Sequence, residues 1–335
     1  MWRDRRLLVL VFTAVFASGF VAGLLVAKHL SCNDSCSMHA VAKTGRGHDL
    51  ASIVETIRSL LVRGPSSTVR DQALRALVDY ASRRSILVNE SVELVPGWRQ
   101  CVGLKLYKGI VYWFSVDATG GGSVDVYLVI GGREEYLGEA APGRGLSEHL
   151  VPRSIIDASL CLLNNGSEKA LVRVAVSASL PRNITNDPVY KVLAIALWAR
   201  DNLRYVSDPR GLEYVASPDE TLKTMSGDCD DFAVLLASMY RAVGLRAGVA
   251  LVDTSGDHVP DHASVLVALP PDKEELSARM AALLQALGVP FDGFTSISRG
   301  NTTWLVIDPA MAYNGTEPWL VTLPDYEVVG FVEPG

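Results

Sequence analysis

The chain has 335 residues, of which 49% are hydrophobic and 20% are charged, and this composition is typical of folded proteins. The formal net charge is -6 and no basic cluster is evident beyond the N-terminus, which argues against nucleic-acid binding. The length is enough for two compact domains besides an N-terminal anchor.

The first predicted element is a membrane-spanning helix over residues 7–27. This stretch contains no charged residue and is about long enough to cross a bilayer as a helix. It follows Arg3, Arg5 and Arg6, and positive charge before a span favours a cytoplasmic N-terminus. We therefore expect the chain after Lys28 to be extracytoplasmic. A cleaved signal peptide is the alternative, but its apolar region is normally shorter and a clear cleavage site normally follows.

Asparagine usage supports the extracytoplasmic assignment. The abundance of serine and threonine predicts roughly one or two Asn-x-Ser/Thr sequences by chance. Six of the nine asparagines stand in such sequences. We expect N-glycosylation at these positions, which are Asn33, Asn89, Asn165, Asn183, Asn301 and Asn314.

Five cysteines leave one unpaired when the others form disulfides, and Cys229 is the natural free thiol. Cys101 and Cys161 both fall in predicted strands and are candidates for one disulfide. Cys32 and Cys36 are one helical turn apart, and they are candidates for pairing with each other or with a second chain. The spacings are equally compatible with four reduced thiols.

Helical periodicity predicts two helices after the anchor, over residues 49–62 and 67–83. The sequence Gly64-Pro65-Ser66-Ser67 between them is typical of a turn. We expect a helical hairpin next to the membrane that serves as a stalk or a brace.

From about Ser91 to Pro181 the apolar residues alternate with polar ones, as in Tyr112, Phe114 and Val116. The pair Asn165-Gly166 is a strong hairpin signal between two such runs. Short strands at this spacing predict an antiparallel β-sandwich of about eight strands. Its expected role is binding or spacing.

Beyond residue 228 an apolar stripe predicts a helix, and Gly244 is placed to end it. Asp228 occupies the N-cap position and Asp231 lies three residues on, as in a capping box. Cys229 thus lies at the positive end of the helix dipole, where a thiolate is favoured and backbone N–H groups can hold an oxyanion. The stripe consists of Phe232, Leu235, Leu236, Met239 and Val243.

A thiolate nucleophile needs a base and a group that orients the base. His262 opens a predicted buried strand over 263–269, and Asp308 closes a second strand over 303–307. If the strands are antiparallel neighbours, both side chains lie at the same edge of the sheet, where the Cys229 helix would begin. His258 is a second candidate base, but it stands in a polar loop that contains Pro260.

Three motifs in this order resemble the transglutaminase-like superfamily, a branch of the papain-like cysteine-nucleophile enzymes. They are Gly227-Asp228-Cys229-Asp230-Asp231, His262-Ala263-Ser264 and Ile307-Asp308-Pro309. The resemblance covers roughly residues 187–327. It implies an α+β catalytic domain in which Cys229 is the nucleophile, His262 the base and Asp308 the orienting residue.

The family often supplies a second oxyanion donor from upstream of the cysteine, and Trp198 and Tyr205 are the candidates here. Many relatives carry an aromatic residue where this chain has Ser264, which implies a more open site. The acidic pair Asp230 and Asp231 is expected to cap the helix. We predict no metal and no cofactor, because no second carboxylate cluster at ligand spacing accompanies that pair.

The predicted organisation is multidomain: a cytoplasmic tip and anchor over 1–30, a helical hairpin over 31–90, a β-sandwich over 91–182 and a transglutaminase-like domain over 183–335. An amphipathic helix is predicted within the insertion 270–300, and it is expected either to form one wall of a cleft or to cover the surface. We expect a cell-surface peptidase or amide hydrolase acting on proteins or peptides. The alternatives are a cross-linking transglutaminase and an inactive binding module.

Overall fold

The computed structural model describes residues 50–209, 214–270, 272–291, 293–299, 301–308, 310 and 327–334. All of them belong to one compact unit that spans Thr44–Gly335. The predicted membrane span over 7–27 lies outside the described residues, as do Cys32, Cys36, Asn33 and Asn314. Within the described part of the chain, no helix combines the length and the apolar character needed to cross a membrane.

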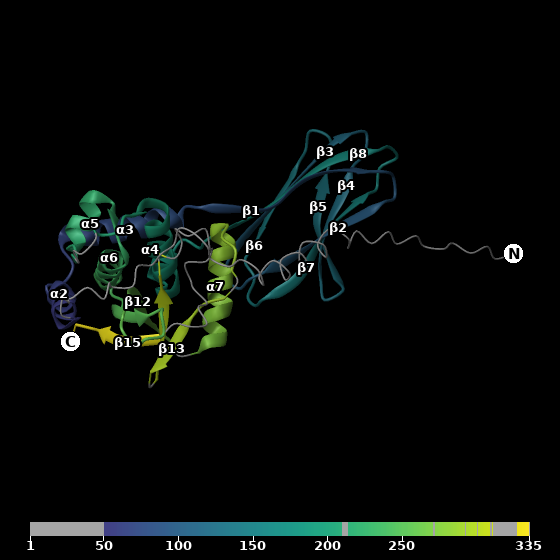
Figure 1. The fold of residues 1–335 in the computed structure, drawn as a ribbon. Helices are drawn as coiled ribbons and strands as arrows, with labels where there is room; N and C mark the ends of the chain where they lie inside the picture. The colour runs from purple at the N-terminus through teal and green to yellow at the C-terminus, as the bar shows by residue number, and fades with distance from the viewer. Residues whose placement is uncertain are drawn as a thin grey trace. The chain divides into compact units, whose positions relative to one another are not determined.

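The middle of the chain forms an antiparallel β-sandwich, as its alternating pattern predicts (Figure 1). One sheet has the strand order β1-β8-β3-β6 and the other has the order β2-β7-β4-β5. Inward positions such as Tyr112, Phe114 and Val116 are fully or almost fully buried between the sheets. The strands are β1 (Arg84–Leu94), β2 (Arg99–Leu106), β3 (Val111–Gly120), β4 (Val124–Ile130), β5 (Arg133–Ala140), β6 (Leu146–Leu150), β7 (Ile156–Asn164) and β8 (Ala170–Ser179).

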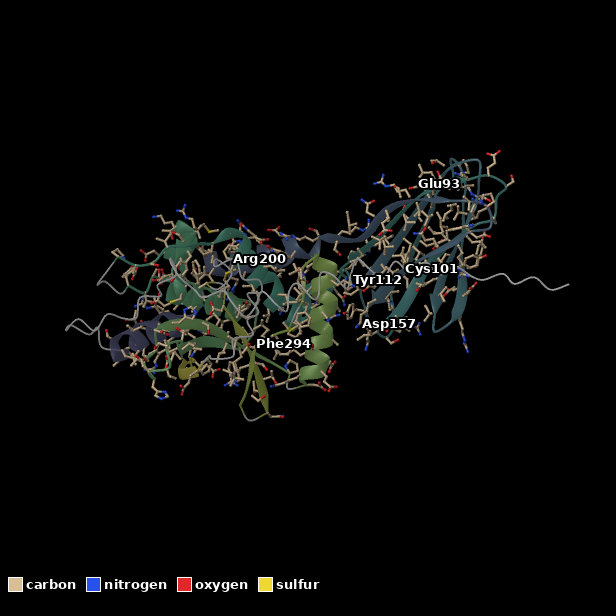
Figure 2. All side chains as sticks on the ribbon, turned by 45° about the vertical axis from the view of Figure 1, so that its right-hand side comes forward. Glu93, Cys101, Tyr112, Asp157, Arg200 and Phe294 are labelled. Carbon is tan, nitrogen blue, oxygen red and sulfur yellow. A yellow bond between two sulfur atoms is a disulfide. The ribbon has the colours of Figure 1, made fainter. Side chains whose placement is uncertain are left out.

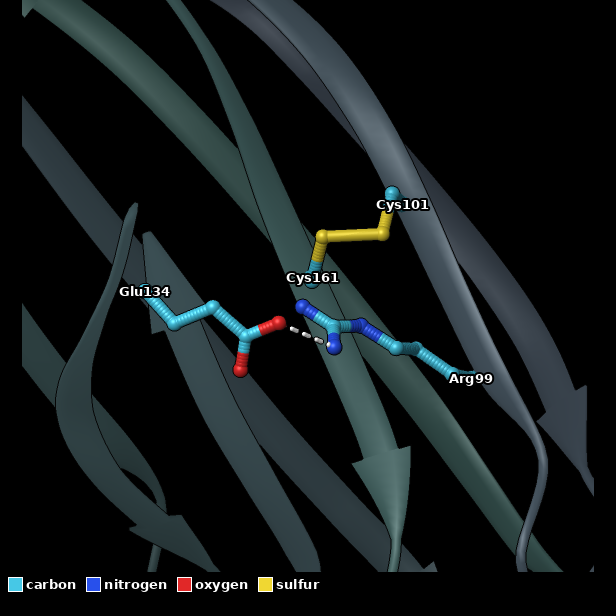
Figure 3. Close-up of a disulfide and its surroundings, with 4 residues drawn as sticks. All are labelled: Arg99, Cys101, Glu134 and Cys161. Atoms are coloured by element: carbon cyan, nitrogen blue, oxygen red, sulfur yellow. Dashed lines mark hydrogen bonds and ion pairs between the residues drawn. A yellow bond between two sulfur atoms is a disulfide. The ribbon is translucent and has the colours of Figure 1, made fainter. Parts of the chain in front are cut away.

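A disulfide joins Cys101 and Cys161, which stand directly opposite each other on β2 and β7 (Figure 3). Arg99 on β2 forms an ion pair with Glu134 on β5, with 2.6 Å between Nη1 and Oε1, and Figure 3 shows this pair beside the disulfide. The second sheet is therefore fastened across its strands by a covalent bond and by an ion pair.

A second layered part is built from helices and a five-stranded antiparallel sheet with the order β13-β14-β12-β11-β15. Helix α6 contacts β11 and β12 of this sheet. The elements that follow the sandwich are the 3-10 helix η1 (Ile184–Asn186), α4 (Pro188–Asn202), β9 (Arg204–Tyr205), α5 (Pro218–Thr224), β10 (Ser226–Gly227), α6 (Cys229–Ala242), β11 (Ala247–Asp253), β12 (His262–Leu269), α7 (Lys273–Leu287), β13 (Ser296–Arg299), β14 (Thr302–Ile307) and β15 (Glu327–Val332).

The predicted hairpin helices are α2 (Leu50–Val62) and α3 (Ser67–Ala81). Both contact α6, and α3 also contacts α4 and α5. The Tyr190 hydroxyl on α4 donates to the backbone oxygen of Leu77 at 2.5 Å, and the Arg241 guanidinium on α6 donates to that of Leu61. These two helices therefore complete the helical layer, and the sandwich is inserted in the chain between α3 and η1.

Helix α7, which lies within the predicted insertion, contacts β1 and β8 of the sandwich. Gln285 joins α7 to further strands of the sandwich, because its amide oxygen accepts the hydroxyl of Tyr112 on β3 at 2.6 Å and its amide nitrogen donates to Lys105 O on β2 at 2.9 Å. Its backbone oxygen accepts the Ser85 hydroxyl at 2.7 Å. Tyr112, labelled in Figure 2, is fully buried, so this hydroxyl depends on its protein partners.

Gln285→Ala is expected to lower the free energy of unfolding by about 1–3 kcal/mol, because it leaves the buried Tyr112 hydroxyl without its acceptor and Lys105 O without a donor. Urea unfolding measures the change. Gln100→Ala is the matched control, because Gln100 is exposed on β2, and it should change the unfolding free energy by less than about 0.5 kcal/mol. Equal effects of the two substitutions would contradict the role of Gln285 in joining α7 to the sandwich.

Candidate active site

The residues before Cys229 are held by a short parallel pairing of β9 with β10. Tyr205 stands opposite Gly227, and the backbone N–H of Val206 donates to Gly227 O at 2.8 Å. Helix α6 then begins at Cys229, with Asp228 at the N-cap position as the sequence predicts. The nucleophile candidate therefore follows directly after a fixed backbone segment.

Asp231 ties this segment to the loop before α5. Its Oδ1 accepts the backbone N–H of Ala216 at 2.6 Å and its Oδ2 accepts that of Asp228 at 3.2 Å. The side chain stands directly over Gly227, where an added Cβ would lie 2.4 Å from Asp231 Oδ2. Glycine is required here by this close approach. Sequence reasoning assigned Asp231 to capping and missed its bond to the loop.

His262 and Asp308 meet at one edge of the sheet, as predicted. His262 Nε2 lies 2.6 Å from Asp308 Oδ2, and both side chains are buried. Burial lowers the pKa of His262, but the charge of Asp308 and hydrogen bonds with Asp308 and Cys229 outweigh it and hold that pKa well above its usual range. The geometry thus favours an imidazolium ring.

Cys229 is a free, half-buried cysteine whose side chain is hydrogen-bonded to His262. Because Asp308 occupies Nε2 of the ring, Nδ1 is the nitrogen left for the sulfur. The structure therefore brings Cys229, His262 and Asp308 together, while their catalytic roles stay a prediction. His258 lies in the exposed loop after β11, where its Nδ1 is 3.0 Å from Glu327 Oε2.

The two candidate oxyanion donors lie in different places. Trp198 is buried within the hydrophobic core. Tyr205 is 37% exposed, and its ring stands edge-on to that of Phe232 in the first turn of α6. Burial and then the charge of Cys229 raise the pKa of Tyr205 to about 12, so the phenol keeps its proton at neutral pH. Of the two, Tyr205 is the side chain beside the nucleophile.

Two groups of side chains have the composition of metal ligands in the described part of the chain. Asp228, Asp230 and Asp231 surround the start of α6, and Asp253, His258 and Glu327 form the second group. The Asp253 carboxylate is already engaged by the backbone N–H groups of Ser255, Gly256 and His258. Such saturation makes Asp253 a turn-stabilising residue rather than a free ligand. Neither group changes the prediction that the site works without a metal, which stays a prediction.

Gly227→Ala is expected to displace the Asp231 carboxylate, since the new methyl group would overlap it. The expected loss is about 1–3 kcal/mol of unfolding free energy, together with slower alkylation of Cys229 by iodoacetamide. Gly103→Ala is the control, because no atom lies within 4 Å of its added Cβ. Unchanged stability and alkylation in Gly227→Ala would show that Asp231 does not hold the segment.

Asp308→Asn is expected to lower the pKa of His262, because the charge that stabilises the imidazolium is removed while burial remains. NMR titration of the ring protons measures the change. Glu327→Gln is the matched control, because it removes a carboxylate from the exposed His258 and should leave the His262 titration unchanged. An unshifted His262 in Asp308→Asn would contradict the coupling.

Comparison with known proteins matches residues 178–309 to the model of the transglutaminase-like superfamily. No curated protein matches the chain at a significant level. Among solved structures, "Putative Cysteine Protease from Cytophaga hutchinsonii" is 12% identical, with 69% of this chain and 83% of that chain covered and a TM-score of 0.26. The mitogen from Yersinia pseudotuberculosis is 14% identical, with 30% and 88% covered and a TM-score of 0.22.

Both TM-scores lie below 0.5, so these two likenesses establish neither the fold nor the function of this chain. The superfamily match covers the helix of Cys229, the strand of His262 and Asp308, which are the three places that carry the resemblance in the sequence. The superfamily generally consists of cysteine peptidases and acyltransferases. The chain therefore contains a transglutaminase-like domain over residues 178–309.

Proposed function

We propose that this chain is a thiol enzyme that acts on amide bonds of proteins or peptides. The observation that carries the proposal is a chain of hydrogen bonds at the start of α6. Cys229 is hydrogen-bonded to His262, and His262 is hydrogen-bonded to the buried Asp308. A buried histidine with a carboxylate on one nitrogen and a thiol on the other is arranged for proton transfer at the sulfur.

In the proposed first step, the Cys229 thiolate attacks the amide carbonyl carbon and forms a carbon–sulfur bond. The thiol proton resides on His262, which gives it to the leaving nitrogen as the carbon–nitrogen bond breaks. The product is a thioester, and the amine departs. Asp308 keeps Nε2 of the ring engaged, so that Nδ1 stays directed at the sulfur.

The negative charge that develops on the carbonyl oxygen needs donors. The backbone N–H of Cys229 at the start of α6 is one, since the first N–H groups of a helix have no partner within the helix. The neutral Tyr205 hydroxyl is the proposed second donor, because this tyrosine stands beside Cys229 and Trp198 does not.

The thioester then reacts with water, which gives hydrolysis, or with a primary amine, which gives cross-linking. We propose hydrolysis as the main outcome, and amine transfer is a distinct outcome of the test below. A domain that binds without catalysis is the third outcome, since a fold does not by itself fix an activity.

The proposed location is the extracytoplasmic face of the cell membrane, with residues 7–27 as the bilayer anchor. Two features support it. Asn89, Asn165, Asn183 and Asn301 are exposed, as acceptors of N-linked glycans must be. The disulfide between Cys101 and Cys161 is of a kind that persists in oxidising compartments.

Full-length protein incubated with a peptide mixture and a labelled primary amine is expected to yield cleaved peptides in amounts that depend on Cys229. Mass spectrometry measures both cleavage and amine incorporation. Cys229→Ala should reduce products to background, because the nucleophile is absent. Asp257→Asn, a change in an exposed loop, is the matched control and should leave the rate unchanged.

A thiol-directed probe separates an enzyme from a binding module. Labelling at the Cys229 peptide is expected to be fast in the native protein and about tenfold or more slower in His262→Ala, since the base is lost. Equal, slow labelling before and after His262→Ala would overturn the proposed catalytic set. Incorporation of the amine without cleavage of peptides would show that the enzyme is a transferase and not a hydrolase.

A further inference from the structure

Three carboxylates crowd the nucleophile at the start of α6. One oxygen of each of Asp228, Asp230 and Asp231 lies within 4.8 Å of the others. Asp230 is only 5% exposed and Asp231 6%. Within the described residues, none of the three forms an ion pair with a base. Three full negative charges in so small a buried volume would repel one another strongly.

The hydrogen bonds divide the three acids into two kinds. Both oxygens of Asp231 accept backbone N–H groups, which is the environment of an ionised carboxylate. Oδ1 of Asp228 and Oδ1 of Asp230 are buried and accept no hydrogen bond from the described residues. A buried oxygen of an ionised carboxylate is costly when it lacks a donor. A donor is therefore missing at this pair, and a proton on one of the two acids would supply it.

We propose that Asp230 is a neutral carboxylic acid at neutral pH and that its hydroxyl donates to the Asp228 carboxylate. The single proton removes the charge of the more buried acid and gives the other acid a donor. The first turn of α6 then carries two negative charges instead of three beside Cys229. Asp230 is thus a positioning residue, which acts on the reaction through Asp228 and through the charge felt by the sulfur.

The electrostatics of the pair agree with this assignment. Burial, the hydrogen bond with Asp228 and the charges of Asp228, Cys229 and Asp231 all raise the pKa of Asp230, and they hold it well above its usual range. Burial raises the pKa of Asp231 only to about 6, because its two backbone donors favour the ionised form. Asp231 is therefore ionised at neutral pH while Asp230 is not.

Groups on neighbouring elements do not offset the charge of the pair. Tyr205 on β9 faces Asp228 and Asp230 as a neutral phenol. Asp208, after β9, adds a further negative charge toward Asp228 and Asp231. His262 on β12 is hydrogen-bonded to Asp308 and to Cys229. The proton on Asp230 is thus the local means of reducing negative charge on this side of the sulfur.

The consequence for catalysis rests on the proposed function, whereas the protonation does not. Each negative charge near Cys229 opposes formation of its thiolate, so a third charge would weaken the nucleophile. Keeping Asp230 neutral leaves the positive end of the α6 dipole and His262 free to stabilise the thiolate.

Infrared spectroscopy tests the protonation directly. At about pH 8, the difference spectrum between the full-length protein and its Asp230→Asn variant is expected to contain the C=O stretch of a protonated carboxylic acid, which shifts in heavy water. Asp231→Asn is the matched control and should remove only carboxylate absorption, because Asp231 is ionised at that pH. Absence of the acid band from the Asp230→Asn difference spectrum would overturn the proposal.

A second measurement follows the effect on the sulfur. The rate of alkylation of Cys229 by iodoacetamide at pH 7, followed at its own peptide, is expected to change less than about twofold in Asp230→Asn, since asparagine replaces one neutral donor by another. If Asp230 were ionised, the substitution would remove a full negative charge beside the sulfur and raise the rate about tenfold. That result would also overturn the proposal.

The two readouts separate this proposal from the proposed function. An acid band lost in Asp230→Asn, in a protein that cleaves no peptide, supports the shared proton and rejects the enzyme. Peptide cleavage by a protein that lacks the acid band supports the enzyme and rejects the shared proton. Asp257→Asn should leave both the acid band and the alkylation of Cys229 unchanged, because Asp257 is exposed in a loop.

Discussion

Burial of α6 is the constraint on which the rest of this molecule depends. Every residue from Asp230 to Tyr240 is buried, because the helix lies against β11 and β12 on one side and is contacted by α2, α3, α4 and α5 on others. Each large apolar side chain buried in this way contributes about 1.5–3 kcal/mol. A helix enclosed to this extent has little freedom to shift, so its first residue has a fixed position.

That fixed position has a cost, because the first turn of α6 carries three acids into the same enclosed space. The three acids differ in how their charge is stabilised. Asp231 accepts the backbone N–H of Ala216 and so holds the loop, and it fits there because Gly227 has no side chain. Asp228 and Asp230 each keep one buried oxygen without a partner among the described residues, and the proton that we propose on Asp230 joins the two side chains. The burial of α6, which fixes the position of the sulfur, therefore also determines the environment of the three acids beside it.

Much of this was accessible from the sequence because the signals were local. The stripe from Phe232 to Met239 fixed the helix, its polar start indicated Cys229, and two short apolar runs placed His262 and Asp308 at strand ends. Long-range facts were not accessible in this way. The packing of α2 on α6 and the contact of Gln285 with Tyr112 join residues about 180 positions apart, and no periodicity reports on such pairs. The burial of Asp230 was missed for the same reason, since an acid in a first turn is usually solvated.

The insertion of the sandwich between α3 and η1 dictates an order of completion during synthesis. All eight strands lie within residues 84–179, and the two ends of this segment meet where Arg84 pairs with Ser179. A growing chain can therefore finish the sandwich as an independent unit. Helices α2 and α3 leave the ribosome earlier, yet their packing partners α4, α5 and α6 are made only after it. The first helices of the described chain must wait with apolar faces exposed, so a completed sandwich precedes the layer that positions the nucleophile.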